Sequence, residues 1–344
     1  MAYTVIDKST NFFTPKLYTG NGGTTTVTGI PFEPDMTWIK NRSALGDHEI
    51  YDKTRGVGYR IYPNATAGHD DLGSQGLSAW NSDGFTVGNN GAINGNGNNI
   101  VSWNWKANGA GASNTDGSIN TTKTSANTTS GCSIITYTGN GSAGATIGHG
   151  MGIKPSMVMV KELAGGNDWI VYTQALTANK ILYLNTTGVQ NDNNVFFNDT
   201  EPTDSLITLG SISATNGSGV AMVAYCFSDV QGYSKQDSYI GNGSANGTFV
   251  YTGFKPAWVL IKNTTASEAW FLYDSKRGYN GSMGALFPDE TAADAFANNI
   301  DFLSNGFKLR TGGAILNGNT TRYIYMAFAE SPFVSTNNAA ATAR

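Results

Sequence analysis

Two polar motifs with one spacing are the residues of this chain best placed to do chemistry, Tyr51-Asp52-x-x-Arg55-Gly56 and Tyr273-Asp274-x-x-Arg277-Gly278. A carboxylate and a guanidinium beside an aromatic ring could bind a sugar, with the tyrosine as the stacking face. The same residues could form a corner between a strand and a turn, in which Arg braces Asp and Gly supplies a positive φ. A motif repeated in tandem at a turn serves the fold first. We therefore predict structural corners, and keep as possible ligand contacts Tyr51, Asp52, Arg55, Tyr273, Asp274 and Arg277.

The other reactive side chains do not form a catalytic or metal-binding pattern. His48, His69 and His149 are scattered, without a His or Cys at zinc-ligand spacing and without a Ser-His-Asp grouping. Glu201 and Asp289-Glu290 stand beside prolines in expected loops, so a sandwich-type glycoside hydrolase is a remote alternative. The Gly-rich tracts do not follow a strand and open a helix, as a phosphate-binding loop would. We predict no catalytic, cofactor-binding or metal site, and hence no enzyme.

An apolar stretch that follows a proline and ends in lysine occurs three times, at residues 35–40, 156–161 and 257–262. A Tyr-x-Gly-Asn-Gly turn signal precedes each copy, and a tyrosine follows each lysine by eleven residues. Self-similarity with a period of about a hundred residues indicates tandem structural repeats. We expect the three lysines to extend their ammonium groups to the rim of each repeat.

The repeats divide the chain into six segments. Residues 1–16 are an N-terminal docking arm, 17–107 the first repeat, 108–130 a Gly/Ser/Asn/Thr linker, 131–236 the second repeat, 237–333 the third, and 334–344 an exposed C-terminal tail. The loop from Asn89 to Asn99 reads as a hairpin connection.

Composition favours strands and turns over helices. Gly accounts for 43 of 344 residues, and 13% are charged, while 40% are hydrophobic, enough to build packed cores. Short strands between turn signals predict an all-β fold of three tandem antiparallel β-sandwich domains. A propeller is the rival, but its blades repeat at about 40 to 50 residues. We expect one short helix, over residues 291–297, because Glu290 precedes a run of alanines.

The last strand of each repeat predicts contacts between repeats or subunits. In repeat 1 it alternates Val101, Trp103 and Trp105 with polar residues, which indicates a wet outer face. In repeats 2 and 3 the corresponding outer face carries no charge, so a neighbouring repeat or subunit should cover it. The residues expected at such contacts are Phe12, Phe13, Cys226, Tyr323 and Tyr325. The two cysteines, Cys132 and Cys226, are either buried thiols or a disulfide between paired strands.

Charge and hydropathy exclude two classes of partner. A net charge of −4 argues against a nucleic-acid binder, which needs a basic surface. The longest apolar run, residues 220–227, is too short to span a membrane. Residues 1–8 lack the basic start and apolar core of a secretory signal, so we expect assembly in a cytoplasm.

The repeated motifs resemble a repeat domain of structural proteins of tailed, particularly marine, bacteriophages, where it is often labelled tail fibre. The resemblance covers residues 17–333. It rests on the Tyr-x-Gly-Asn-Gly starts, the stretches at 34–40 and 51–56, Asp83-Gly84-Phe85, the strand at 101–106, and the segments at 109–119 and 145–152. It implies concanavalin- or laminin-G-like jelly-roll sandwiches carried on a virion, and it does not imply an enzyme.

We therefore expect a virion structural protein of tail-fibre or host-attachment type that acts by multivalent binding. The alternative is a capsid decoration or tail adaptor protein without receptor binding, which a repeat array starting almost at Met1 favours. Exposed aromatics on free loops would favour attachment, and uncharged faces buried at subunit contacts would favour decoration. The expected partners are other virion proteins, further copies of this chain, and a host cell-surface glycan or protein.

Overall fold

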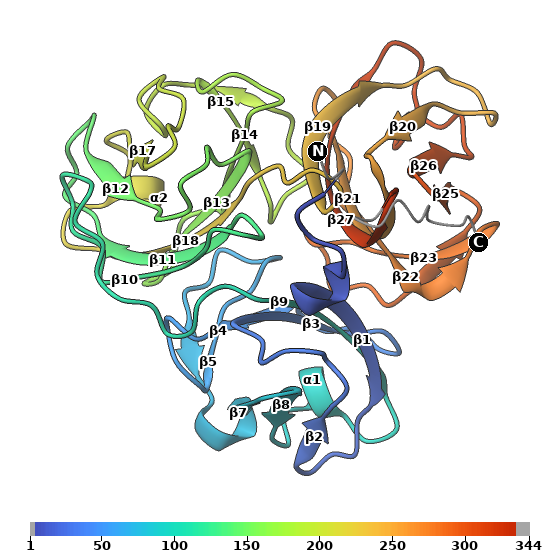
Figure 1. The fold of residues 1–344 in the computed structure, drawn as a ribbon, viewed down its shortest axis with the longest axis horizontal. Coiled ribbons are helices and arrows are strands. Elements are labelled where there is room, and N and C mark those ends of the chain that lie inside the picture. Colours follow the sequence, from blue (N-terminus) through green and yellow to red (C-terminus); the bar gives the residue numbers. More distant parts are fainter. Residues whose placement is uncertain (1–3, 335–344) are drawn as a thin grey trace.

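The structure is a computed structural model that describes residues 4–334, so the predictions for residues 1–3 and 335–344 lie outside the described residues. Three lobes surround a common centre, and each lobe presents one large sheet to that centre (Figure 1). All paired strands run antiparallel apart from one isolated parallel bridge, which confirms the predicted all-β class of antiparallel sandwiches.

Lobe 1 contains a four-stranded sheet in the order β1-β9-β3-β4, a three-stranded sheet β2-β8-β7, and the pair β5-β6. Its strands are β1 (Phe13–Thr19), β2 (Thr25–Val27), β3 (Met36–Asn41), β4 (Glu49–Asp52), β5 (Tyr59–Arg60), β6 (Asp70–Asp71), β7 (Leu77–Asn81), β8 (Gly84–Val87) and β9 (Asn99–Trp105). Its helical turns are η1 (Ser9–Asn11), η2 (Gly73–Gln75) and α1 (Gly91–Asn94).

Lobe 2 contains a seven-stranded sheet, β10-β11-β18-β13-β14-β15-β16, and the pair β12-β17. Its elements are β10 (Lys123–Asn127), β11 (Cys132–Thr138), β12 (Thr146–Gly148), β13 (Met157–Glu162), β14 (Ile170–Thr173), β15 (Lys180–Tyr183), β16 (Asn191–Asp192), β17 (Leu206–Thr208), α2 (Ser213–Asn216) and β18 (Ala221–Phe227).

Lobe 3 contains a six-stranded sheet, β19-β27-β21-β22-β23-β24, and a three-stranded sheet β20-β26-β25. Its strands are β19 (Ser234–Ile240), β20 (Phe249–Tyr251), β21 (Phe254–Asn263), β22 (Phe271–Tyr279), β23 (Ser282–Leu286), β24 (Ala295–Ala297), β25 (Ile300–Leu303), β26 (Gly306–Leu309) and β27 (Arg322–Pro332).

The three large sheets share one four-stranded unit, in which the first strand pairs with the last, the last with the strand after the proline, and that strand with the next. The register is the same in each lobe, as the pairs Trp38↔Trp103, Met159↔Tyr225 and Leu260↔Met326 show. The sequence period is therefore a structural period.

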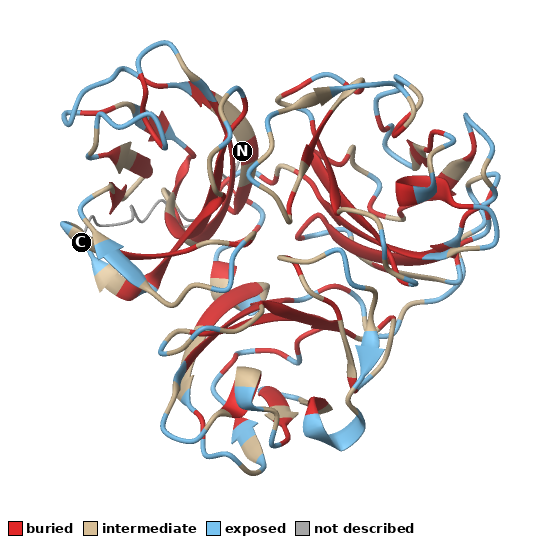
Figure 2. Cartoon of the chain, turned by 180° about the vertical axis from the view of Figure 1, so that it is seen from behind, coloured by how far each residue is buried: buried red, intermediate tan, exposed pale blue. Residues whose placement is uncertain are grey.

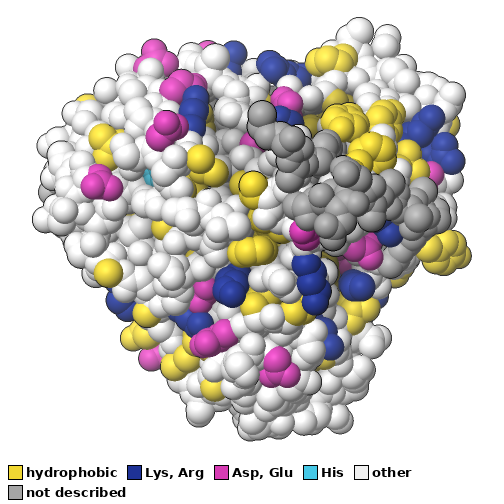
Figure 3. Space-filling view, in the orientation of Figure 1, with side chains coloured by type: hydrophobic (Ala, Val, Ile, Leu, Met, Phe, Trp, Pro, Cys, Tyr) yellow, Lys and Arg dark blue, Asp and Glu magenta, His cyan; other side chains and the backbone are white. Residues whose placement is uncertain are grey.

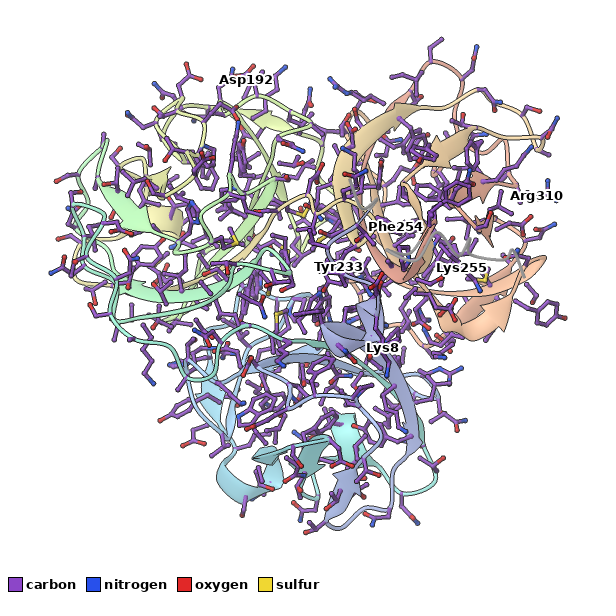
Figure 4. All side chains as sticks on the ribbon, in the orientation of Figure 1. Lys8, Asp192, Tyr233, Phe254, Lys255 and Arg310 are labelled. Carbon is purple, nitrogen blue, oxygen red and sulfur yellow. The ribbon has the colours of Figure 1, made fainter. Side chains whose placement is uncertain are left out.

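The largest hydrophobic core lies between the lobes rather than inside one of them. It joins side chains from all three repeats, among them Trp38, Trp103, Trp169, Trp258 and Phe328. The strands that face it are buried along most of their length (Figure 2). Tyr233 lies where the lobes meet (Figure 4), and its ring contacts Phe12 and Phe328 edge-on. Each lobe also has its own core, but the shared core makes the lobes interdependent.

This arrangement corrects the predicted wet outer face of the last strand in repeat 1. Trp103 and Trp105 point into the central core, while Ser102 and Asn104 are fully buried inside the lobe. Asn104 receives a hydrogen bond from Thr37 (3.0 Å) and donates one to the backbone of Thr14 (2.9 Å). Both faces of the strand are covered because a second layer of protein lies on each side.

Three local predictions were wrong because pairing with distant residues decided the outcome. Residues 291–297 form no helix, since Ala295–Ala297 pair as β24 with β23 and distant strand pairing outweighs the helix propensity of alanine. The predicted linker contributes β10, which pairs with β11. An edge strand can form from a segment with few large apolar side chains, because its backbone groups make the hydrogen bonds of the sheet. The expected hairpin connection at residues 89–99 instead joins β8 and β9, which belong to different sheets, and it contains the helical turn α1. The first strand also begins inside the predicted arm, at Phe13.

Candidate functional site

The two Tyr-Asp-x-x-Arg motifs form buried corners at the end of β4 and inside β22. In each, Arg Nε donates to Asp Oδ2, at 2.6 Å for Arg55 and Asp52 and 2.5 Å for Arg277 and Asp274. The backbone amide of each arginine donates to Oδ1 of the same aspartate. Glycine follows each arginine with φ of +99° at Gly56 and +112° at Gly278. The bracing and the positive φ are those of the predicted corner.

Each corner also receives a side chain from the last strand of the neighbouring repeat. Tyr225 of repeat 2 donates its hydroxyl to Asp52 at 2.7 Å, and Trp103 of repeat 1 donates Nε1 to Asp274 at 2.8 Å. The Asp52 carboxyl is buried, which would raise its pKa. The Arg55 guanidinium and the hydroxyl groups of Thr54 and Tyr225 nevertheless hold its pKa below the usual value. The motifs therefore join repeats and leave no face of the aspartates for a soluble ligand.

Repeat 2 lacks the motif, and its partner position changes with it. Thr173 and Leu176 replace the aspartate and the arginine. The residue of repeat 3 that corresponds to Trp103 and Tyr225 is Met326, which carries no hydrogen-bond donor to match a carboxylate. A polar contact at two of the junctions thus becomes apolar at the third.

The three strand-ending lysines connect the lobes in a ring instead of reaching the rim as predicted. All three side chains are buried, and each ammonium donates to a backbone carbonyl of another repeat. The bonds are Lys40 to Thr291 (3.1 Å), Lys161 to Thr66 (2.9 Å) and Lys262 to Thr187 (2.8 Å). Burial lowers the pKa of each lysine to about 8.

Tryptophan side chains add a second contact between repeats at two of the three junctions. Trp169 donates Nε1 to the carbonyl of Tyr62 in repeat 1, and Trp270 donates to that of Tyr183 in repeat 2, both at 2.8 Å. His48 occupies the corresponding position in repeat 1, where it accepts a hydrogen bond from Trp38 at 2.9 Å. Burial lowers the pKa of the His48 imidazole well below its ordinary value, so this imidazole is neutral.

The Tyr-x-Gly-Asn-Gly motif has a structural role in every repeat. Its tyrosine hydroxyl donates to a loop carbonyl at 2.6 Å in the pairs Tyr18 to Ile93, Tyr137 to Thr215 and Tyr239 to Leu316. One buried asparagine of that loop binds the asparagine of the motif and the backbone around it, in the pairs Asn94 with Asn21, Asn216 with Asn140 and Asn317 with Asn242. The motif therefore closes each lobe by joining the first strand to the loop before the last strand.

The residues predicted to contact other repeats fall into two groups. Phe13 stacks on Phe328 of repeat 3 with ring centroids 5.0 Å apart, and Phe12 contacts Tyr233, so both meet another part of the chain. The prediction was wrong for Cys226, Tyr323 and Tyr325, which lie in the cores of their own lobes. Cys132 and Cys226 are free thiols: their strands pair, but the two side chains enter the cores on opposite faces of the sheet.

The remaining polar candidates serve local contacts. Glu201 pairs with Lys154 at 2.9 Å, and Asp289 accepts a hydrogen bond from the Trp270 amide at 3.0 Å. His149 contacts the backbone carbonyl of Thr203, and His69 stacks on Tyr59. Between residues 4 and 334 no group of three or more His, Cys, Asp or Glu side chains is placed to hold a metal ion. Within the same range no helix has the length and apolar character needed to cross a bilayer.

Two features of the surface were not predicted. An open depression of about 510 Å³ in lobe 1 is lined by Glu33, Lys53, Gly56, Val57, Trp80, Gly109 and Ala110. Among the described residues, large exposed hydrophobic side chains are concentrated on lobe 3, and these include the large exposed aromatics Phe249, Tyr251, Tyr279 and Phe296. Figure 3 shows hydrophobic side chains gathered over this lobe.

A position-by-position comparison of the repeats could have found the first of these features. Trp80 stands where repeats 2 and 3 have Glu201 and Phe302. By the same comparison Glu49, a buried carboxylate bound by Tyr51 at 2.5 Å and Arg60 at 2.7 Å, stands where the other repeats have Ile170 and Phe271. Trp80 and Glu49 are therefore features of lobe 1 alone at these aligned positions.

The fold and these contacts define an all-β protein in which three repeated lobes are joined by buried side chains. Residues 8–332 match the family described as Domain of unknown function (DUF7483), and the chain belongs to that family. Since the match runs through all three repeats, the family's unit is the three-lobed assembly and not a single repeat. No curated protein and no solved structure matches the chain.

Proposed function

We propose that this protein is a structural protein of a tailed bacteriophage particle, of tail-fibre or host-attachment type, which binds its target without catalysis. The observation that carries the choice of attachment is the position of the exposed aromatic side chains. Among residues 4–334 the four large exposed aromatics all lie on lobe 3, on strands β20, β22 and β24 rather than on free loops. Solvent-facing Phe and Tyr provide binding area that a purely internal scaffold does not need.

The uncharged strand faces that would have favoured capsid decoration are used inside the chain. Ala224 and Cys226 fill the core of lobe 2, and Tyr325 and Ala327 fill that of lobe 3, so neither face requires a second subunit. The repeated polar motifs are likewise used to join the lobes. In this proposal several copies on one particle bind weakly, and avidity supplies the strength.

The test is binding of the purified chain to host cells and to capsids stripped of this protein. Replacement of the four exposed aromatics of lobe 3 by serine should lower cell binding by at least about tenfold, the equivalent of 1.4 kcal/mol. The matched control replaces Leu45 and Val189, which are exposed on lobes 1 and 2, and should bind as the wild type does. Binding to stripped capsids but not to cells would contradict attachment and support decoration. Imaging of the particle would then place the chain on its tail or its head.

A further inference from the structure

The depression around Trp80 is an open hollow of about 510 Å³ in the surface of lobe 1, and none of the contacts that join the lobes explains it. Six of the seven tryptophans are fully buried, and Trp80 is the one that remains partly exposed. Its indole packs against the core of lobe 1, so the ring is held in place from below. We infer that this depression binds a neutral saccharide, with the exposed part of the Trp80 ring as the platform for one sugar ring.

The polar groups around the indole suit hydroxyl groups, which donate and accept hydrogen bonds at once. Glu33, whose side chain is 49% exposed, supplies an acceptor, and Lys53 supplies a donor. Lys53 Nζ lies 2.7 Å from Glu33, 2.9 Å from Asp35 and 5.9 Å from the centre of the Trp80 ring, so both charged groups are fixed beside the platform. Neighbouring hydroxyls of a sugar can bridge such a pair.

The charge of the site selects against ionic ligands. Two carboxylates and one ammonium leave a net charge of −1, which disfavours phosphate, sulfate and uronic acids. Lys53 disfavours a cation on the indole, because its ammonium, 5.9 Å from the ring centre, repels a second positive charge. Gly56 and Gly109 leave the backbone on two sides of the depression free of side chains, so a bulky ring can approach it. These features together favour a neutral, hydroxyl-rich ring.

The other two repeats show the same location in a closed form. In repeat 2 the position of Trp80 is Glu201 and that of Glu33 is Lys154, and these two side chains form an ion pair at 2.9 Å. In repeat 3 the position is Phe302, which is buried, and Asn280 at the tip of the β22–β23 hairpin makes two 2.9 Å hydrogen bonds to its backbone. At this location of repeat 3 the depression, lined by Lys255, Gly278, Tyr279 and Phe302, has a volume of only about 10 Å³, against about 510 Å³ in repeat 1.

This inference deepens the attachment proposal and rests on it for the source of the sugar, a host surface polysaccharide. Its test uses the purified full chain and an array of neutral probes: oligosaccharides of glucose, galactose, mannose and N-acetylglucosamine. Sulfated and uronic-acid oligosaccharides serve as acidic counterparts. We expect saturable binding to at least one neutral probe and a change in tryptophan emission, because Trp80 is the partly exposed indole.

The variants separate a binding role from a packing role. Trp80→Ala should lower the affinity by at least about tenfold, Trp80→Phe should retain part of it, and Glu33→Gln should weaken it with unchanged thermal unfolding. Leu45→Ser, at an exposed apolar residue of lobe 1 that does not line the depression, is the matched control and should bind as the wild type does.

Absence of binding to every neutral probe, binding to acidic probes alone, or wild-type affinity in both Trp80→Ala and Glu33→Gln would overturn the inference. The result is separable from the attachment test. Sugar binding by a chain that does not attach to cells would contradict attachment alone. Attachment that depends on lobe 3, with no sugar bound, would contradict this inference alone.

Discussion

At the scale of single residues, the polar motifs of this chain join neighbouring repeats through buried hydrogen bonds. Asp52 accepts hydrogen bonds from Arg55, from the nearby Thr54 hydroxyl and from Tyr225 of another lobe. A buried carboxylate with that many donors is stable only while all of them remain. The contacts across the junction therefore depend on one another.

Asp52→Thr alone should destabilise the protein by about 3–5 kcal/mol, because it leaves the Arg55 guanidinium buried without a counter-charge. Transfer of the apolar set of the third junction, as Asp52→Thr, Arg55→Leu and Tyr225→Met together, should recover most of that loss. Urea unfolding of the single and triple variants measures both values. Equal destabilisation by the two variants would show that the apolar residues of the third junction cannot replace the polar residues of this one.

The lysine ring predicts a pH dependence of stability between pH 8 and pH 10. Burial lowers the pKa of the three lysines from 10.5 to about 8, so in this window the folded chain binds fewer protons than the unfolded chain. Stability therefore rises as the pH rises from 8 to 10, and this contribution is absent below pH 8. The charged groups that act on the lysines are Asp47, Asp294 and Arg277 for Lys40, Glu162 and Asp168 for Lys161, and Asp289 and Glu268 for Lys262.

Replacement of all three lysines by methionine should remove this rise. The free energy of unfolding from urea titrations at pH 7, 8, 9 and 9.5 gives the slopes for the wild type and the variant. The series stops below pH 10 because buried tyrosines, whose pKa values are raised, then contribute with the opposite sign. Burial also raises the pKa of the Cys132 and Cys226 thiols, which oppose the rise from about pH 9 in the wild type and the variant alike. A variant with the wild-type slope would place the titrating groups elsewhere.

At the scale of elements, the Tyr-x-Gly-Asn-Gly turn depends on close contact between two backbones. A Cβ atom on Gly20 would lie 2.3 Å from the carbonyl oxygen of Gly95, and the corresponding distances at Gly139 and Gly241 are 2.4 and 2.2 Å. These glycines are present because the first strand and the loop before the last strand approach one another there. The asparagine pair beside them closes the same junction.

Gly20→Ala should destabilise the protein by about 1–3 kcal/mol, because the backbone of α1 has to move away from the new methyl group. Gly91→Ala is a matched control in the same lobe, since a Cβ there meets no atom within 4 Å and alanine favours the helical turn. Thermal unfolding of the two variants should separate them by several degrees. A loss at Gly91 as large as that at Gly20 would contradict the close-contact explanation.

At the scale of the whole molecule, the lobes behave as parts of one cooperative unit. Their large sheets are buried on both faces, and the central core contains residues from all three repeats. A lobe separated from the others would expose tryptophans such as Trp103 and Trp258 to water. The three-lobed body, rather than the sandwich, is the stable form.

The full chain should therefore unfold in one transition with matching calorimetric and van't Hoff enthalpies. Residues 108–233, which contain every strand of lobe 2, should aggregate or bind a hydrophobic dye when expressed alone, without the dispersed amide spectrum of a folded domain. Calorimetry of the full chain and spectroscopy of the fragment check these outcomes. A fragment that folds alone, or three separate transitions, would show three independent domains.

The sequence by itself determined the repeat period, the all-β class, the strands that follow the prolines and the Asp–Arg corners. Each of these depends on neighbours in the sequence, through alternation, turn residues or a side chain binding its own loop. Only the tertiary structure decided which carbonyl groups the lysine ammonium groups contact, why residues 295–297 form a strand, and which side of the last strand faces the centre. Alternation sorts Trp103 and Ser102 onto opposite faces, but it does not say what covers each face, because the covering layers come from residues distant in the chain.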